Sequence, residues 1–249
     1  MKRIMLIVAY DGTNYSGWQV QPNADTIEGR LNTTLSSLLG EEICVTGASR
    51  TDAGVHSMGN VAVFDTDSRI PAEKMAPAIN ARLPEDIIVQ KSMEVNADFH
   101  PRKCDCVKTY EYRIFTGRMA NPQLIRYTWH RYGQLDVEAM RRAAACLVGE
   151  HDFTSFCAVA SDALSKVRTI YSIDVEKHDE VLTIRVKGNG FLYNMVRIIA
   201  GTLVNVGMGR TDPADIPGIL EGRDRRLAGP TAPAKGLTQV GIEYYILIN

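Results

Sequence analysis

The first hundred residues alternate between two spacings of apolar side chains. Residues 3–10 (RIMLIVAY) form an unbroken apolar run, which predicts a strand buried on both faces. Residues 25–40 carry isoleucine and leucine at helical spacing instead, so they predict a helix that Asp25 caps and Gly40 ends. Further strands are predicted at residues 42–49, 60–67 and 86–95, and a further helix at residues 71–84. The resulting order is βαββαβ.

The second half repeats this order without visible sequence repetition. Residues 107–115 (VKTYEYRIF) alternate between two faces, as a strand does. The other predicted elements are strands at residues 167–177, 180–188 and 240–249 and helices at residues 136–149 and 191–207. Two split βαβ units result, which is the ferredoxin-like pattern.

The fold class that follows is α+β. We expect two βαββαβ halves, of the ferredoxin or RNP type, joined into one mainly antiparallel sheet with helices on one face and a central cleft. Periodicity lapses at residues 96–106, so we place the boundary there. Residues 1–100 then form an N-terminal subdomain, and residues 101–249 form a C-terminal subdomain that completes the cleft.

Composition indicates the cellular setting. The chain of 249 residues is 45% hydrophobic, enough for a normal core, and no stretch approaches the roughly 20 apolar residues of a membrane span. No signal-peptide cleavage pattern follows the N-terminus. The five cysteines lack the paired spacing of a zinc site and are expected to be free thiols. We therefore expect a soluble, cytoplasmic protein with no membrane partner.

Charge is distributed unevenly along the chain. The whole chain has a formal net charge of −1, whereas His100–Arg131 contains seven lysines and arginines against two acidic residues. Aromatic residues are interleaved in this stretch, and this mixture suits phosphate contact and base stacking. A solvated charged face with ordinary core aromatics fits the same signal equally well. The candidate phosphate contacts are Arg113, Arg118 and Arg126.

A short polar loop, residues 48–60 (ASRTDAGVHSMGN), separates two apolar stretches. Asp52 lies at its turn, close to Gly54, which can supply a positive φ, and aspartate in such a place is commonly a turn residue. The alternative is a carboxylate nucleophile or general base, kept ionised by Arg50 two positions away. His56 is a candidate base or substrate contact, or simply a hydrogen-bonded histidine.

A second candidate segment, residues 188–197 (GNGFLYNMVR), has a Gly-Asn-Gly turn that opens a helix. It is no dinucleotide fingerprint, because Tyr193 occupies the position of the third glycine. Asn189 in the turn is a candidate substrate contact. Arg197 is the one charge on an apolar helix, so it either extends to solvent or pairs with an anion such as Asp52.

Five blocks, in this order, resemble the TruA family of tRNA pseudouridine synthases. They are YDGTNYSGWQVQ, SRTDAGVHSMGNVAVF, KTYEYRI, GEHDFTSF and GNGFLYNMVRIIAGTLVNVG. The resemblance covers essentially the whole chain. One departure is Ser49, where the family more often has glycine; the RTD core that follows is intact.

The resemblance implies an enzyme that isomerises uridine to pseudouridine in the anticodon stem-loop of tRNA, at positions 38–40. It implies that Asp52 is the catalytic aspartate, that Arg50, Tyr110 and Arg197 have roles in the site, and that a homodimer holds tRNA in its cleft. The isomerisation needs no redox change, hydrolysis or energy input. Neither a cofactor nor a metal is therefore expected, and no nucleotide or metal motif occurs in the sequence.

The residue types suit these roles and leave several alternatives open. Tyr110 either removes the C5 proton or stacks on the flipped uracil, and Arg50 either contacts phosphate or fills the gap left by the extruded nucleotide. Asp52 attacks the base, attacks the sugar or removes a sugar proton. The rival functions are a noncatalytic RNA-binding protein with paired RNP-like units and a glycosidase, which normally needs a second carboxylate.

Overall fold

The computed structural model describes residues 1–245, which form two compact units. Unit 1 comprises Met1–Cys106 and the described residues from Gln239 onward, and unit 2 comprises Val107–Thr238. The sequence pattern placed the boundary near residue 100 and the last strand in the second half. In the structure, most of that strand is grouped with unit 1.

Unit 1 has the expected βαββαβ order. Its elements are β1 (Lys2–Tyr10), α1 (Ile27–Leu39), β2 (Thr46–Gly47), β3 (His56–Thr66), α2 (Ala72–Asn80) and β4 (Ile87–Val95), together with the part of β10 (Leu237–Tyr244) that follows Thr238. The strand order is β4-β1-β3-β10, and β2 pairs with β3. Strand β1 is antiparallel to both β3 and β4, so β1 is central and apolar on both faces.

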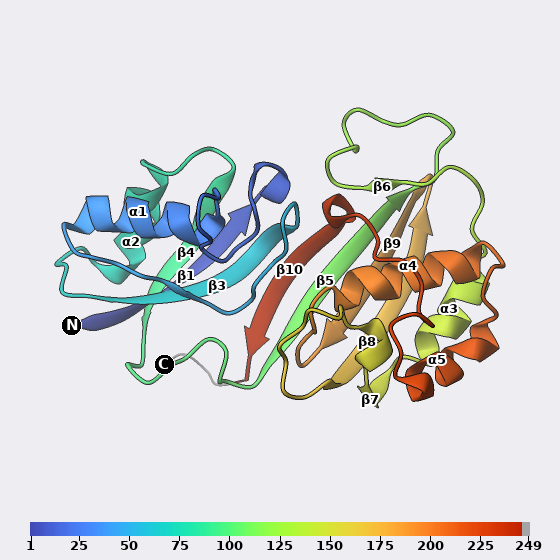
Figure 1. Cartoon of the computed structure of the whole chain (residues 1–249). Helices are drawn as coiled ribbons and strands as arrows, with labels where there is room; N and C mark the ends of the chain where they lie inside the picture. Colours follow the sequence, from blue (N-terminus) through green and yellow to red (C-terminus); the bar gives the residue numbers. More distant parts are fainter. Residues whose placement is uncertain (246–249) are drawn as a thin grey trace. The chain divides into compact units, whose positions relative to one another are not determined.

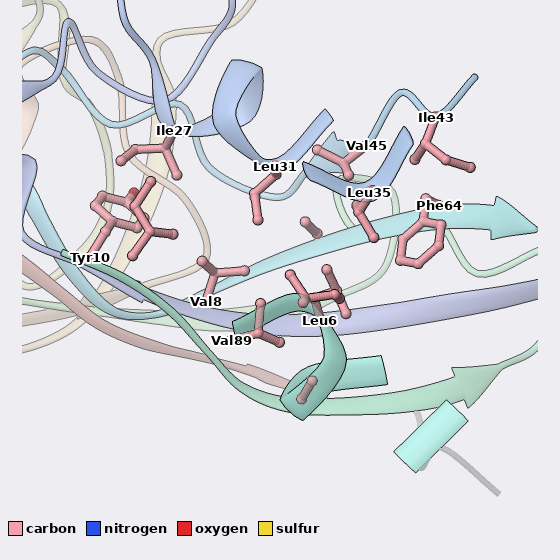
Figure 2. Packing of buried hydrophobic residues seen from close by; sticks show 14 of the residues in the cluster. Leu6, Val8, Tyr10, Ile27, Leu31, Leu35, Ile43, Val45, Phe64 and Val89 are labelled. Carbon is pink, nitrogen blue, oxygen red and sulfur yellow. The ribbon is translucent and has the colours of Figure 1, made fainter. Parts of the chain in front are cut away.

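Both helices of unit 1 cover one face of its sheet. The core on that face joins alternate residues of β1, such as Leu6 and Val8, to the buried stripe of α1 and to residues of α2. Figure 2 shows Leu31 and Leu35 of α1 directed at the sheet. A smaller cluster around Met5 fills the opposite face. Helices on one face of a mainly antiparallel sheet therefore confirm the α+β class for this unit.

Two local expectations in unit 1 were wrong. Thr26, not Asp25, caps α1: its side chain accepts from the N–H of Gly29, while Asp25 forms an ion pair with Arg30 at 2.5 Å. Threonine lies one residue nearer the helix and so reaches the free amides of the first turn. Gly40 ends the helix as expected, with φ at 68°.

The strand predicted at residues 42–49 is reduced to the two residues of β2. Side chains of α1 take the backbone amides that a longer strand would have used. The N–H of Ile43 donates to Oγ of Ser36, and the N–H of Val45 donates to Oδ1 of Asn32. Such side-chain acceptors compete with strand pairing, so residues 43–45 are bonded to the helix instead of extending the sheet.

Unit 2 contains more elements than the sequence indicated. They are β5 (Cys106–Phe115, of which Cys106 is grouped with unit 1), β6 (Trp129–His130), α3 (Val137–Ala145), β7 (Gly149–Asp152), β8 (Val167–His178), β9 (Val181–Gly188), α4 (Met195–Gly207) and α5 (Ile216–Gly222). Strands β5, β9, β8 and β7 are neighbours in that order and antiparallel, and the short β6 is parallel to β5. Helices α3, α4 and α5 lie on one side of these strands (Figure 1). Strands β6 and β7 and helix α5 were not expected.

Helix α4 begins four residues later than predicted. Asn194 adopts a left-handed conformation, with φ at 60°, so regular helix starts only at Met195. Strand β10 covers Leu237–Tyr244 rather than residues 240–249, of which residues 246–249 lie outside the described part. The five cysteines are free, as expected. No helix in residues 1–245 is both long enough and apolar enough to cross a membrane.

Candidate active site

The polar loop of unit 1 forms a tight turn around Asp52. Gly54 has φ at 75°, the positive value that the sequence suggested, and the N–H of Val55 donates to the carbonyl of Asp52 at 3.1 Å. The Asp52 side chain is half-buried, whereas Arg50 is exposed. In the described part of the chain, Arg50 makes no hydrogen bond or ion pair. This turn thus carries the carboxylate of Asp52 and, two residues before it, the exposed guanidinium group of Arg50.

A second loop, residues 11–18, lies directly against this turn. The hydroxyl groups of Tyr10 and Thr51 share a buried hydrogen bond of 2.7 Å. The N–H of Trp18 donates to the carbonyl of Thr51 at 3.0 Å, and the N–H of Gly54 donates to the carbonyl of Tyr15 at 3.3 Å. The turn is therefore tied to the preceding strand and loop on both sides of Asp52.

Two glycines make this close approach possible. A Cβ on Gly17, whose φ is 91°, would lie 2.6 Å from the carbonyl oxygen of Thr51 and 3.0 Å from the carbonyl carbon of Asp52. A Cβ on Gly12 would lie 2.0 Å from the carbonyl oxygen of Val55. No other residue fits at these positions without moving the backbone of the turn.

His56 lies beneath the turn and is only 3% exposed. Its Nδ1 accepts from the N–H of Gly12 at 3.2 Å and lies 3.1 Å from a carboxylate oxygen of Asp11. Asp11 also accepts from the N–H of Thr13, so it caps the short helical turn that follows. Through these contacts, His56 supports the loop 11–14.

Ser49 belongs to a buried polar network behind the turn. Its hydroxyl accepts from Nε2 of Gln239 at 2.9 Å, and its carbonyl accepts from Nδ2 of Asn60 at 3.0 Å. Gln239 in turn accepts from the hydroxyl of Ser57 at 3.3 Å. The side chain of Ser49, the residue that departs from the family pattern, thus takes part in this hydrogen-bond network. Sequence reasoning missed Asn60 and Gln239, since no local spacing connects them to the loop.

Tyr110 lies on β5 of unit 2 and is 8% exposed. Its ring meets the edge of Phe191 at 5.1 Å and 78°. Phe191 follows the Gly-Asn-Gly turn, in which Asn189 exchanges hydrogen bonds of 3.0 Å with the backbone of Thr169 through both its amide N–H and its side-chain oxygen. The structure therefore gives Asn189 a role in fastening this turn to β8, close to the phenylalanine that packs on Tyr110.

Arg197 lies in the first turn of α4 and is half-buried. Its Nε donates to the carbonyl of Ala232 at 2.8 Å, and its Nη1 donates to Oδ1 of Asn194 at 2.7 Å. Two bonds to different segments fix the plane of the guanidinium group. The charge thus stays partly inside the unit instead of extending freely into solvent.

Two arginines bind Glu111, an acidic residue of the basic stretch. Nη2 of Arg113 donates to Glu111 at 2.9 Å, and Arg185 binds the other oxygen of the same carboxylate. Burial opposes ionisation of Glu111, but the hydrogen bonds from Arg185 and Arg113 hold its pKa below the usual value. Arg118 and Arg126 are exposed.

Some aromatic residues of this stretch are ordinary core residues. Tyr112 is fully buried, and its hydroxyl donates to the carbonyl of Pro233 at 2.8 Å. Burial raises the pKa of this phenol well above its usual value, although the charge of Arg197 opposes the shift. Tyr127 is 40% exposed. The interleaved pattern therefore combined core positions with surface positions.

Residues 1–245 contain no group of three or more histidine, cysteine or acidic side chains arranged to hold a metal ion. Glu150, His151 and Asp152 are adjacent polar residues of β7, and the last two support local structure. Oδ1 of Asp152 accepts from the backbone and the hydroxyl of Thr154, which lowers the pKa of the aspartate. His151 bonds to the carbonyl of Val148.

Comparison with known proteins identifies the class. The profile described as tRNA pseudouridine synthase matches residues 6–102 and 143–245, which include the Asp52 turn and helix α4. The chain belongs to the tRNA pseudouridine synthase family. The expectation drawn from the five sequence blocks is thereby confirmed.

Similar curated proteins share one name, tRNA pseudouridine synthase A. Proteins named tRNA pseudouridine synthase A from Ruminiclostridium cellulolyticum and Brevibacillus brevis are each 49% identical, over 98% of this chain and 100% of their own length. One from Halalkalibacterium halodurans is 46% identical over 95% of this chain and 90% of its own. A solved structure described as a Cbf5-Nop10-Gar1 complex is similar over 81% of this chain and 54% of that chain, with 13% identity and a TM-score of 0.34.

Proposed function

We propose that this isomerase converts uridines at positions 38–40 of the tRNA anticodon stem-loop into pseudouridine, with Asp52 as its catalytic aspartate. Family membership establishes an isomerase that acts on tRNA uridine. The observation that carries the assignment of Asp52 is its turn, in which a half-buried carboxylate is braced on both sides and an uncommitted arginine stands two residues away.

The chemistry asks for few groups. The C1′–N1 bond breaks, the uracil turns, a C1′–C5 bond forms, and a proton leaves C5 while N1 gains one. Atoms and electrons balance without an oxidant or a reductant. A carboxylate that traps or stabilises the electrophilic intermediate and a base for the C5 proton are sufficient. Asp52 suits the first role.

Tyr110 and Arg197 supply the remaining functions in this proposal. The ring of Tyr110 is fixed against Phe191, so it offers either a flat surface for the uracil or a hydroxyl for the C5 proton. Arg197 is held by two hydrogen bonds and provides an aimed positive charge that favours an ionised carboxylate. Neither role requires a cofactor.

Arg50 and the exposed arginines of unit 2 serve RNA binding. Extruding the target nucleotide costs a few kcal/mol, and less at the end of a stem than within a duplex. Arg50, exposed beside Asp52, suits a phosphate contact or the space that the nucleotide leaves. Arg118, Arg126 and Arg113 supply further phosphate contacts, while His56 and Asn189 support the loops that face the substrate.

The proposal includes a homodimer in the cytoplasm. The dimer rests on the resemblance to the TruA family, and the location rests on the composition and on the tRNA substrate. Sedimentation of the purified chain with and without tRNA tests the dimer directly. A monomer at all concentrations would remove it.

The decisive experiment maps pseudouridine on unmodified tRNA transcripts after incubation with the wild type or Asp52→Asn. The wild type should modify the 3′ side of the anticodon arm, and Asp52→Asn should modify nothing while binding tRNA within a few-fold of the wild type. Asp98→Asn is the matched control, since it removes a charge of the same sign from an exposed position. Loss of tRNA binding together with activity would instead make Asp52 a structural residue.

The rival function, RNA binding without catalysis, gives a different result. It predicts no pseudouridine from the wild type and no effect of Asp52→Asn, because a carboxylate offers nothing attractive to phosphate.

A further inference from the structure

Asp52 is attached to the chain by two peptide groups, and the structure fixes both. The carbonyl of Thr51 belongs to the peptide group that precedes Asp52, and it accepts the N–H of Trp18 at 3.0 Å. Because a peptide group is planar, a hydrogen bond to its oxygen restricts rotation of the whole group. The backbone that leads into Asp52 is therefore restrained by residue 18.

The peptide group that follows Asp52 is held by packing. A Cβ on Gly17 would lie 3.0 Å from the carbonyl carbon of Asp52 and 3.1 Å from the nitrogen of Ala53, the two atoms that this group joins. Glycine thus allows the loop to press directly on this peptide group. Gly54, one residue further on, donates its N–H to Tyr15.

A pair of hydroxyl groups, on Tyr10 and Thr51, also supports the turn. Together with the contacts of Gly17 and Trp18, this pair forms what we call the brace of Asp52. Tyr10 and Thr51 are 5% and 7% exposed, and their hydroxyl oxygens are 2.7 Å apart. The ring of Tyr10 also lies 6.0 Å from that of Trp18. Water does not readily reach groups buried this deeply, so deleting one hydroxyl leaves the other without a hydrogen-bond partner. The remaining side chain then moves to find a new partner, and the backbone of Thr51 shifts with it.

The brace is kept at a cost to stability. The indole N–H of Trp18 is buried, with no hydrogen-bond partner among the described residues. Buried donors without acceptors are rare, and they are often found where a functional geometry is maintained. Gly17 similarly occupies a left-handed conformation at φ 91°.

We propose that Tyr10 and Gly17 are positioning residues for Asp52: the Tyr10 hydroxyl, through Thr51, and the bare Cα of Gly17 set the direction of the catalytic carboxylate. This inference rests on the proposed function of Asp52. Neither residue needs to touch the RNA. Their effect is on the rate of the chemical step rather than on substrate binding.

The test compares single-hydroxyl deletions. Tyr10→Phe keeps the buried ring and removes only the hydroxyl, Thr51→Val removes its partner, and Thr51→Ser keeps a hydroxyl at the same position. Tyr244→Phe is the matched control, because it also deletes a hydrogen-bonded tyrosine hydroxyl in unit 1; this hydroxyl donates to the carbonyl of Pro101, outside the turn. For each variant, kcat, KM, tRNA affinity and Tm are measured on one unmodified tRNA transcript.

We expect Tyr10→Phe and Thr51→Val each to lower kcat by about ten- to a hundredfold, as displacement of a catalytic group by a fraction of an ångström to about 1 Å does. KM and tRNA affinity should stay within about twofold. Thr51→Ser should restore most of the rate, and the double variant Tyr10→Phe/Thr51→Val should be no slower than either single variant, since both delete one interaction. Tyr244→Phe should change Tm only.

Other outcomes overturn the inference. An unchanged kcat in Tyr10→Phe, or a loss confined to KM and tRNA affinity, means that the hydroxyl pair does not aim Asp52. Equal losses of kcat in Tyr10→Phe and Tyr244→Phe indicate a general loss of stability. Gly17→Ala should reduce kcat further than Tyr10→Phe in protein that still binds tRNA; wild-type kcat in Gly17→Ala contradicts its role.

The proposed function is judged separately. If the wild type forms no pseudouridine, the proposed function fails before any brace variant is compared. If the wild type is active, Asp52→Asn is inactive and Tyr10→Phe is unaffected, only the positioning inference fails.

Discussion

Nη1 of Arg197 donates a hydrogen bond of 2.7 Å to Oδ1 of Asn194, the residue that precedes α4 with φ at 60°. Asn194 therefore has two functions. Its backbone takes a left-handed conformation that asparagine tolerates better than most residues, and its side chain holds the guanidinium group three residues later. The start of α4 and the orientation of the Arg197 guanidinium group therefore both depend on Asn194.

Substitution can separate these two functions. Asn194→Gly keeps the left-handed backbone and removes the side chain, so stability should change little while kcat falls. Asn194→Ala removes both, and should lower the free energy of unfolding by about 1 kcal/mol more than the glycine variant. Urea unfolding and pseudouridine formation measured on the same preparations decide the point. A fully active glycine variant would show that the bond to Arg197 is dispensable.

Arg197→Lys tests whether charge alone is enough. Lysine keeps the positive charge, but its single ammonium group cannot reproduce the planar arrangement that bonds Ala232 and Asn194 together. We expect kcat to fall at least tenfold with tRNA affinity nearly unchanged. Arg210→Lys, at an exposed position after α4, serves as the control. Wild-type kcat in Arg197→Lys would reduce the role of Arg197 to its charge.

The arginines of the basic stretch should differ in their contribution to tRNA binding. Arg118 is exposed and forms no ion pair with another residue in 1–245, whereas Arg113 shares the Glu111 carboxylate. Arg118→Ala should reduce the slope of log affinity against log salt by about 0.7 to 0.9, the value for one phosphate contact. Arg113→Ala should reduce it less. Titrations at several salt concentrations measure both slopes, and equal slopes in Arg118→Ala and the wild type would remove Arg118 from the binding surface.

Most of the fold follows from local patterns in the sequence. The stripe of Ile27, Leu31 and Leu35 and the final Gly40 locate α1 because burial and a left-handed end are properties of one helix. The same reasoning failed at residues 42–49, where Ser36 and Asn32 take the amides of a predicted strand. A hydrogen bond from a side chain to another segment of the chain leaves no periodic pattern in the sequence, so it cannot be predicted from periodicity.

The candidate site divides in a similar way. Asp52, Gly54 and Arg50 are recognisable together because turn chemistry and carboxylate chemistry occur within five residues. The Tyr10 hydroxyl that meets Thr51, and the Gln239 amide that meets Ser49, come from distant parts of the chain. Contacts of this kind depend on how strands are paired, so no local pattern in the sequence shows them.

Glu111 makes the stability of the protein depend on pH. Its carboxylate is 6% exposed and accepts hydrogen bonds from Arg185 and Arg113, which hold its pKa below the usual 4.5. A pKa that is lower in the folded state means that the carboxylate stabilises the fold fully above the unfolded-state pKa. This contribution disappears as the pH falls through the folded-state pKa.

Glu111→Gln should therefore lower the free energy of unfolding by about 2 kcal/mol at pH 7, the contribution of hydrogen bonds to a charged group. The difference from the wild type should shrink below about pH 4.5 and vanish once the wild-type carboxyl is protonated. Glu138→Gln, which breaks the exposed pair with Arg141, should cost less than about 0.5 kcal/mol at either pH. Urea midpoints measured from pH 7 to pH 3 give all three curves. A difference between the wild type and Glu111→Gln that stays constant over this range would show that the pKa of Glu111 is the same in the folded and the unfolded protein, and that its two arginines do not favour the ionised form.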